Sequence, residues 1–482
     1  MPPIREAGLR LAAESGLYTV GMFLVRAGNF LLLPLYLSLL DPAEYGAFGV
    51  VRQLVVALVP LAVTGQVHSL LRLVVDTEQG SSETSTSLLQ TVVAWVLGSS
   101  LVLTALAAAA WPLLDGWVGG VPLWPLGLAG LGLVAGQGLF NIAQAWLQAV
   151  RRARAHTLLA VLRWLVLLGG VLLFVIGLGW GAPGLLLAMS LSFGLVAIGS
   201  LGLSLRGRPP KVHRDLMRAS LVYGLPLLPH AFSTVVFGAT GQLVIAADPS
   251  AGLAIAGAYL LATQLGQVVA MVAVGVQKAW VPFFLREDRD RDQRGWERVR
   301  VLSFFGLVAV ALTTVAVGLL SPELVALAGL FSPHDWSAAA LVVPILAFSG
   351  LLRAYYLVAL TVVLANKQSA RWLGAVTLPA AVLNVVLTLL WVPAHGMAGA
   401  AWAAVASWGG AAIATGFLAR RARIVPFKYA RAAVLLGLCG AALAAGVEQD
   451  LAVRAGVLAA FVASIALLDG RDLGKAVRSL RG

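Results

Sequence analysis

Long apolar runs alternate with short polar segments along almost the whole chain. A helix needs about 20 apolar residues to cross a hydrocarbon core about 30 Å thick, and the runs have about this length. The pattern therefore predicts an all-α integral membrane protein with about 14 transmembrane helices. The expected crossings are 14–40, 46–74, 87–113, 121–149, 157–178, 182–205, 219–246, 252–284, 299–320, 337–364, 371–392, 397–419, 429–446 and 452–469.

Basic residues fall in every second polar segment, and the segment at 75–86 is the one acidic exception. The segments between them carry acids such as Asp41, Asp248 and Glu323. The one basic residue on that side is Arg454, just inside the last predicted crossing. By the positive-inside rule, a multi-pass protein of the inner (plasma) membrane with both termini in the cytoplasm is expected. The basic segments are 151–156, 206–218, 286–300, 366–371 and 420–431.

The composition narrows the possible functions. Charged residues make up 11% of the chain, against about 25% in a soluble domain, and apolar residues make up 60%. The net charge of +13 is accounted for by the basic loops, so no nucleic-acid partner is expected. The single cysteine, Cys439, lies in an apolar run, which excludes a disulfide framework and a thiol metal site. We expect no metal and no cofactor.

A weak internal repeat divides the chain. Gly46-Ala47-Phe48 and Gly257-Ala258-Tyr259 open two apolar runs six crossings apart, and Gly181-Ala182 and Gly399-Ala400 form a second such pair. Parallel repeats are typical of transporters whose substrate cavity lies between the halves. The predicted organisation is a six-helix lobe at 1–205, a basic cytoplasmic linker at 206–218, a second six-helix lobe at 219–420, and two further helices with a basic cytoplasmic tail at 421–482.

Two glycine motifs are interpreted as structural. Residues 179–184 match G-x-G-x-x-G, but they fall in a turn between two membrane helices without a βαβ unit, so dinucleotide binding is not expected. Gly132 and Gly136 have the spacing of a helix-packing face.

Several cations lie inside the apolar runs, whereas no carboxylate lies deep in any of them. Arg26, Arg52 and Arg353 are the deepest, and Lys278 is nearer the cytoplasmic end of its run. A cation at the bilayer centre costs about 2.5–3.5 kcal/mol, so these residues should face a hydrated cavity. An anionic ligand could complete their pairing, and the planar guanidinium fork suits phosphate. The structural alternative is pairing with backbone carbonyls or neighbouring tyrosines.

Three polar residues are secondary candidates. Asn29 lies one turn after Arg26, and His68 and His230 lie in apolar helices, where a hydrogen-bonded structural role competes with proton relay. Arg72 and Arg163, closer to the cytoplasmic ends of their runs, are interpreted as interfacial anchors.

Several stretches resemble bacterial polysaccharide biosynthesis flippases, which belong to the multidrug/oligosaccharidyl-lipid/polysaccharide exporter superfamily. Residues 31–46 are similar to the hairpin of helices 1 and 2 in that family. Tyr223-Gly224-Leu225-Pro226, the stretch 276–284, and Asn384 with the glycine-rich run at 396–401 are similar to later helices. The resemblance extends over about residues 10–420.

The resemblance implies two six-helix bundles in a V shape and alternating access to a central cationic cavity. The implied cargo is a polyprenyl-pyrophosphate-linked oligosaccharide repeat unit, moved to the outer leaflet for O-antigen, capsule or exopolysaccharide synthesis. Arg26 and Arg52 match pyrophosphate-binding arginines of the related lipid II flippases by helix, and Lys278 alone represents the third. The implied partners are this lipid-linked oligosaccharide, membrane lipids and a polysaccharide polymerase.

Two other classes were weighed. A drug/cation antiporter of the same superfamily would need carboxylates deep in its helices to bind H⁺ or Na⁺ and a cationic drug. A membrane polymerase or ligase acting on lipid-linked glycans would need catalytic groups on a sizeable loop, whereas the longest extracytoplasmic loop expected here is 321–336. We therefore expect a transporter and no enzyme.

Overall fold

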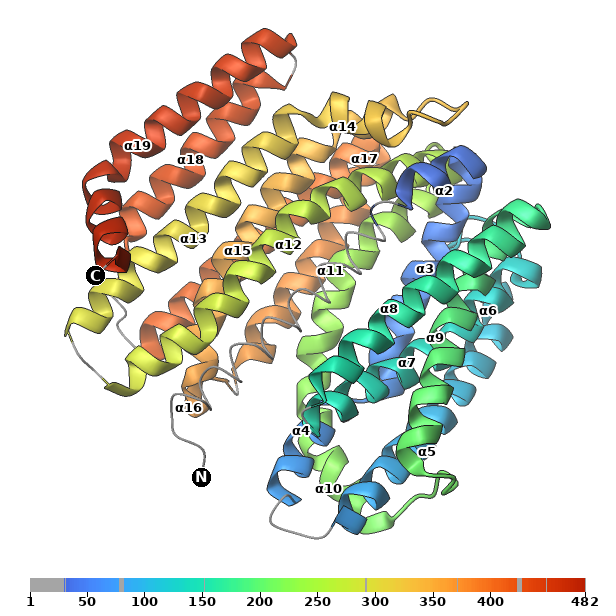
Figure 1. Ribbon diagram of the computed structural model, residues 1–482. Coiled ribbons are helices and arrows are strands. Elements are labelled where there is room, and N and C mark those ends of the chain that lie inside the picture. The colour runs from blue at the N-terminus through green and yellow to red at the C-terminus, as the bar shows by residue number, and fades with distance from the viewer. Residues whose placement is uncertain are drawn as a thin grey trace. The chain divides into compact units, whose positions relative to one another are not determined.

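The computed structural model is helical throughout its described part (Figure 1), which covers residues 30, 32–77, 82–150, 152–290, 293–370, 372–422, 427–447 and 449–481. Eleven helices in this part are long and apolar enough to cross a membrane. The chain forms two compact units: unit 1 comprises residues up to Gly257 with Phe331–His334, and unit 2 comprises the rest.

Unit 1 contains the elements up to the start of α12. They are α2 (Leu33–Leu39), α3 (Pro42–Val63), α4 (Gln66–Thr77), α5 (Ser82–Ala109), α6 (Trp111–Leu114), η1 (Leu123–Gly127), α7 (Leu128–Ala149), α8 (Ala153–Gly170), η2 (Val171–Gly177), α9 (Gly181–Leu205), α10 (Arg214–Gly224), η3 (Leu225–Leu227) and α11 (Leu228–Ala247). Buried valine, leucine and alanine side chains from α3, α4, α5, α7, α8 and α9 form its core.

The glycine motifs of unit 1 are structural, as predicted. An added Cβ on Gly136 would lie 3.1 Å from the nitrogen of Gly194 and 3.2 Å from the carbonyl oxygen of Ser190. Small residues therefore let α7 and α9 approach closely, as in membrane helix packing. Gly179 and Gly181 lie between η2 and α9 with φ of 66° and 50°, a turn that favours glycine.

The predicted second crossing, 46–74, is broken. Thr64 and Gly65 have φ of 47° and 73°, so the chain leaves α3 through two left-handed residues and starts again as α4. Buried polar contacts hold α4 against α10: the Ser69 hydroxyl donates to the Ser220 carbonyl at 2.7 Å, and the Ser220 hydroxyl donates to Gln66 Oε1 at 2.5 Å. The apolar run 46–74 therefore forms two helices: most of α3, and α4, which packs against α10.

The internal repeat produces a reciprocal backbone contact. A Cβ on Gly46 would lie 1.9 Å from the carbonyl oxygen of Leu253, and a Cβ on Gly257 would lie 2.0 Å from that of Pro42. Pro42 and Leu253 stand four residues before the glycines of their own copies. The starts of α3 and α12 therefore touch backbone to backbone, through equivalent residues on both sides.

Unit 2 contains most of α12 and the elements after it. They are α12 (Gly252–Asp290), α13 (Gln293–Leu319), α14 (Ser321–Ala328), η4 (Ser337–Leu341), α15 (Val343–Ala365), α16 (Lys367–Ala370), α17 (Leu373–Ala422), α18 (Tyr429–Gly446) and α19 (Leu451–Arg481). Helices α13, α15 and α17 run side by side (Figure 1) and pack in that order. Gly396, with φ 54° and ψ −134°, interrupts α17, so this helix contains the two predicted crossings 371–392 and 397–419.

The last two helices pack against α13. Cys439 of α18 is fully buried, with its sulfur 3.8 Å from the carbonyl oxygen of Ala311. Arg454 of α19 donates to both carboxylate oxygens of Glu323, at 2.7 and 2.8 Å, and to the Leu319 carbonyl at 2.8 Å. The single basic residue among the acidic loops is therefore paired with one of their acids.

The helical fold class is confirmed, whereas the number of crossings stays a prediction. The apolar helix Ala231–Ala247 is shorter than the eleven candidates, and much of the first predicted crossing lies outside the described residues. The two lobes and the linker between them also remain predictions.

Candidate functional site

Arg52 lies near the middle of α3. The helix begins where the Asp41 carboxylate accepts the backbone N–H of Glu44 at 2.7 Å, with Pro42 in the first turn. This is a regular N-cap, with proline where its missing N–H costs nothing. Arg52 follows ten residues after Pro42, about 15 Å along the axis, and its side chain is half-buried. Its depth in the membrane stays a prediction.

Arg163 is not an interfacial anchor, contrary to the prediction. Helix α8 begins at Ala153 rather than at 157, and η2 extends it to Gly177. Arg163 is therefore about 15 Å from the start of a long helix, and it is 5% exposed. Its guanidinium lies 4.6 Å from the ring centroid of Phe193 and 5.9 Å from that of Phe140.

Tyr36 connects the two arginines. Its side chain on α2 lies within electrostatic range of both Arg52 and Arg163. Three helices, α2, α3 and α8, thus place two guanidinium groups within electrostatic range of one phenol inside unit 1. We call Tyr36, Arg52 and Arg163 the unit 1 cationic cluster.

The cluster carries positive charge that its protein contacts offset only in part. Burying a cation costs several kcal/mol, whereas each aromatic ring returns about 1–2 kcal/mol. Among the residues that the structure describes, the buried charged side chains are Arg163 and Arg454, and neither is a carboxylate. Arg454 has Glu323 as its partner. The unit 1 cationic cluster is therefore suited to an added anion, which would complete the pairing.

Arg353 and Lys278 belong to unit 2. The Arg353 guanidinium lies 5.3 Å from the ring centroid of Trp408, which also contacts the Tyr356 ring at 5.5 Å. The Tyr355 hydroxyl instead donates to the Ala432 carbonyl. Lys278 is exposed on α12. That these two cations share a cavity with Arg52 stays a prediction.

The other candidates are only partly placed. Arg26 and Asn29 lie outside the described residues, as does the side chain of His230. His68 lies on α4, which the break at Thr64–Gly65 separates from α3, and its side chain is exposed in the structure. Its secondary role stays a prediction.

The repeat shows that Arg52 is specific to one half. Its equivalent position, counted from Gly46 and Gly257, is Thr263. The Thr263 hydroxyl donates to the Tyr259 carbonyl of its own helix at 2.8 Å. The first copy of the repeat thus carries a cation at this position, whereas the second carries a hydroxyl that is hydrogen-bonded within its own helix.

The fold is shared with solved membrane transport proteins. The structure of the lipid II flippase MurJ in an inward closed conformation matches with a TM-score of 0.67 and 13% identity, over 95% of this chain and 99% of that one. An inward-facing multidrug resistance MATE family transporter of the MOP superfamily matches with a TM-score of 0.62 and 18% identity, over 85% and 95%. The chain therefore has the fold of these two membrane transport proteins.

The family model for "polysaccharide biosynthesis protein" matches residues 11–287, more than half of the chain. The chain belongs to this polysaccharide biosynthesis protein family. No curated protein matches it significantly. The prediction of a multi-pass membrane protein of this family agrees with these findings, and the two similar folds are those of transport proteins.

Proposed function

We propose that the protein is a flippase that moves a polyprenyl-pyrophosphate-linked oligosaccharide repeat unit from the cytoplasmic to the outer leaflet of the cell membrane. The family supports a role in polysaccharide synthesis, and the fold supports transport. Alternating access through a cationic cavity would carry the pyrophosphate. The product would feed a polysaccharide polymerase, which is the proposed protein partner.

The unit 1 cationic cluster is the observation that carries this proposal. Arg52 is accessible enough to donate two parallel hydrogen bonds to pyrophosphate oxygens, a bidentate contact that a guanidinium makes and an ammonium does not. Arg163 is more deeply buried, and its role is to raise the positive potential around Tyr36 and Arg52. Arg26, Arg353 and Lys278 are proposed to add to the same field, with Asn29, His68 and His230 in secondary roles.

The orientation is also part of the proposal. Basic loops on one side place both termini in the cytoplasm of a cell with an inner (plasma) membrane. The lipid-linked substrate is made on that side, so its pyrophosphate would enter from the basic face.

A drug/cation antiporter is disfavoured, although one similar fold is that of a multidrug transporter. Such a protein needs a carboxylate in its helices, and the buried charges of the described residues are arginines.

The experiment that tests the proposal is complementation of a flippase-deficient strain, with surface polysaccharide as the readout. Arg52→Ala and Arg163→Leu should each reduce surface polymer at least tenfold, and Arg52→Lys should be intermediate because it keeps the charge but loses the fork. Arg208→Ala, in the exposed linker, is the matched control and should complement fully. Immunoblots establish equal expression. Full complementation by well-expressed Arg52→Ala and Arg163→Leu would refute the proposed site.

A further inference from the structure

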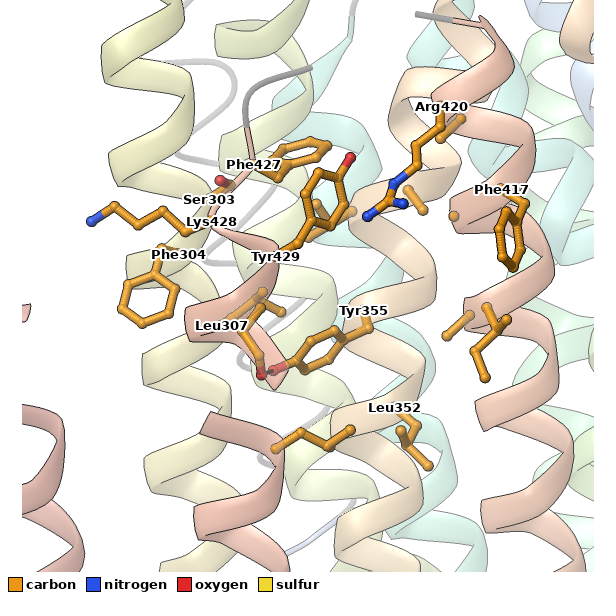
Figure 2. A pocket seen from close by; sticks show the side chains of 18 of the residues that line it. Ser303, Phe304, Leu307, Leu352, Tyr355, Phe417, Arg420, Phe427, Lys428 and Tyr429 are labelled. Atoms are coloured by element: carbon orange, nitrogen blue, oxygen red, sulfur yellow. Dashed lines mark hydrogen bonds between the residues drawn. The ribbon is translucent and has the colours of Figure 1, made fainter. Parts of the chain in front are cut away.

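Unit 2 contains a cavity of about 350 Å³ between α13, α15, the second half of α17 and the start of α18. Figure 2 shows its lining side chains, which are mostly aliphatic or aromatic. Its described lining residues all belong to unit 2, and Arg52, Arg353 and Lys278 are not among them.

Away from the charged edge, the described walls of the cavity offer few hydrogen-bonding groups. The Tyr355 hydroxyl donates to the Ala432 carbonyl at 2.5 Å, and the Ser303 hydroxyl donates to the Arg300 carbonyl at 3.2 Å. A sugar or a nucleotide base would lose hydrogen bonds to water on entering, without gaining replacements. An apolar chain is the ligand chemistry that fits.

The edge of the cavity is positively charged. The Arg420 guanidinium lies 4.1 Å from the ring centroid of Tyr429 (Figure 2), and the Lys428 ammonium lies 5.1 Å from that of Phe304. None of the described lining residues is acidic. Both cations belong to the basic segment 420–431, so they stand at the end of the helices where a lipid headgroup would lie. The charge therefore complements an anionic headgroup.

A cavity of this kind in a membrane protein is poorly suited to water. Water needs two to four polar partners, and an empty space would forfeit the dispersion contacts of its walls. The surrounding bilayer supplies acyl chains, which satisfy both conditions. The volume is at the lower end of ligand pockets, about 300–1,000 Å³, and suits one acyl chain better than a long polyprenyl chain.

We propose that this cavity binds one acyl chain of an anionic glycerophospholipid whose phosphate lies against Arg420, while Lys428 adds positive potential at the same edge. The lipid is a resident of the cytoplasmic leaflet rather than the transported substrate. Each cation near a membrane surface is expected to give about a fivefold preference for an anionic lipid. This inference does not depend on the identity of the transported lipid.

Native mass spectrometry of the delipidated full-length protein tests the site. Phosphatidylglycerol and phosphatidylcholine with identical acyl chains are the probes. Wild-type protein should bind phosphatidylglycerol at least tenfold more tightly. Arg420→Gln and Lys428→Gln should each lower this preference about fivefold.

Variants that fill the cavity with a larger side chain provide a second test of the proposal. Gly416 lines the cavity, and nothing lies within 4 Å of an added Cβ. Gly416→Leu should therefore enter the cavity and weaken phosphatidylglycerol binding at least tenfold. Gly437→Leu, on α18 with equally open surroundings but outside the lining, should stay within twofold of wild type. Ala412→Leu, also in the lining, replaces Gly416→Leu if that variant does not fold.

Three results would overturn the proposal. They are equal binding of both lipids by wild-type protein, undiminished phosphatidylglycerol binding by the filled variants, and displacement of phosphatidylglycerol by an equimolar polyprenyl phosphate. The last result would assign the cavity to a carrier lipid instead.

Discussion

Replacing Arg454 by alanine is expected to loosen the two C-terminal helices from α13. The wild-type guanidinium makes two charge-assisted hydrogen bonds to Glu323 and one to the Leu319 carbonyl. Breaking a fully buried pair costs about 3–5 kcal/mol. The Arg454 side chain is 9% exposed but that of Glu323 is 41% exposed, so the stranded carboxylate can regain water. We therefore expect a loss of about 2–3 kcal/mol.

The chain contains its own reporter for this change. Cys439 is the single cysteine and is fully buried on α18 against α13. A fluorogenic maleimide can react with it only after α18 separates from α13. Where separation is fast and reversible, the labelling rate follows the open population. A loss of 2–3 kcal/mol then corresponds to labelling about 30- to 150-fold faster.

A double-mutant cycle separates the ion pair from other effects. Glu323→Gln combined with Arg454→Ala should label no faster than Arg454→Ala alone, because the two residues act through one contact. Glu297→Gln is the matched control: it removes a single 3.3 Å contact with Arg300 between exposed side chains, worth about 0.2–1 kcal/mol. Wild-type labelling rates in Arg454→Ala, or additive effects in the cycle, would show that the reasoning is wrong.

Two further predictions concern topology and packing. A cysteine introduced at Ser250 should react with a membrane-impermeant thiol reagent added outside the cell, and one introduced at Gln368 should not, because basic loops mark the cytoplasmic side. Labelling of both cysteines from outside would contradict the assigned orientation. Gly46→Ala should lower the thermal unfolding temperature of the purified protein, since the new Cβ would meet a backbone oxygen at 1.9 Å, and overpacking costs about 1–3 kcal/mol. Gly275→Ala on α12 is the control: its new Cβ would have no neighbour within 4 Å, so it should be neutral or slightly stabilising. Equal shifts in unfolding temperature for the two variants would show that the close contact at Gly46 does not cause the destabilisation.

Hydropathy predicted the helices well because each apolar run must satisfy its backbone internally in a membrane. The predicted crossing 429–446 coincides with α18 (Tyr429–Gly446). The break after α3 was missed, because two left-handed residues barely change the mean hydropathy of a window. A Thr-Gly pair after Pro60 was the available signal, since glycine favours that conformation.

The placement of Arg163 could not be obtained from the sequence. Basic residues before 157 were assigned to a loop, although α8 already begins at Ala153, and this shortened the apparent depth of Arg163. Its aromatic contacts come from α7 and α9, and no local pattern encodes them. The pairing of Arg454 with Glu323 was hidden for the same reason, since the partners are 131 residues apart.

The reciprocal contact at Gly46 and Gly257 has the form of an isologous interface, in which residue i meets j while j meets i. If a chain of half this length formed a homodimer, the same contact would be made by one glycine position, once from each subunit. Such a homodimer would have to carry arginine at the position of Arg52 in both subunits or in neither. Covalent fusion removes this restriction, because the two copies can then change independently. A cation at Arg52 and a hydroxyl at the equivalent position, Thr263, form an unequal pair that two identical subunits could not have.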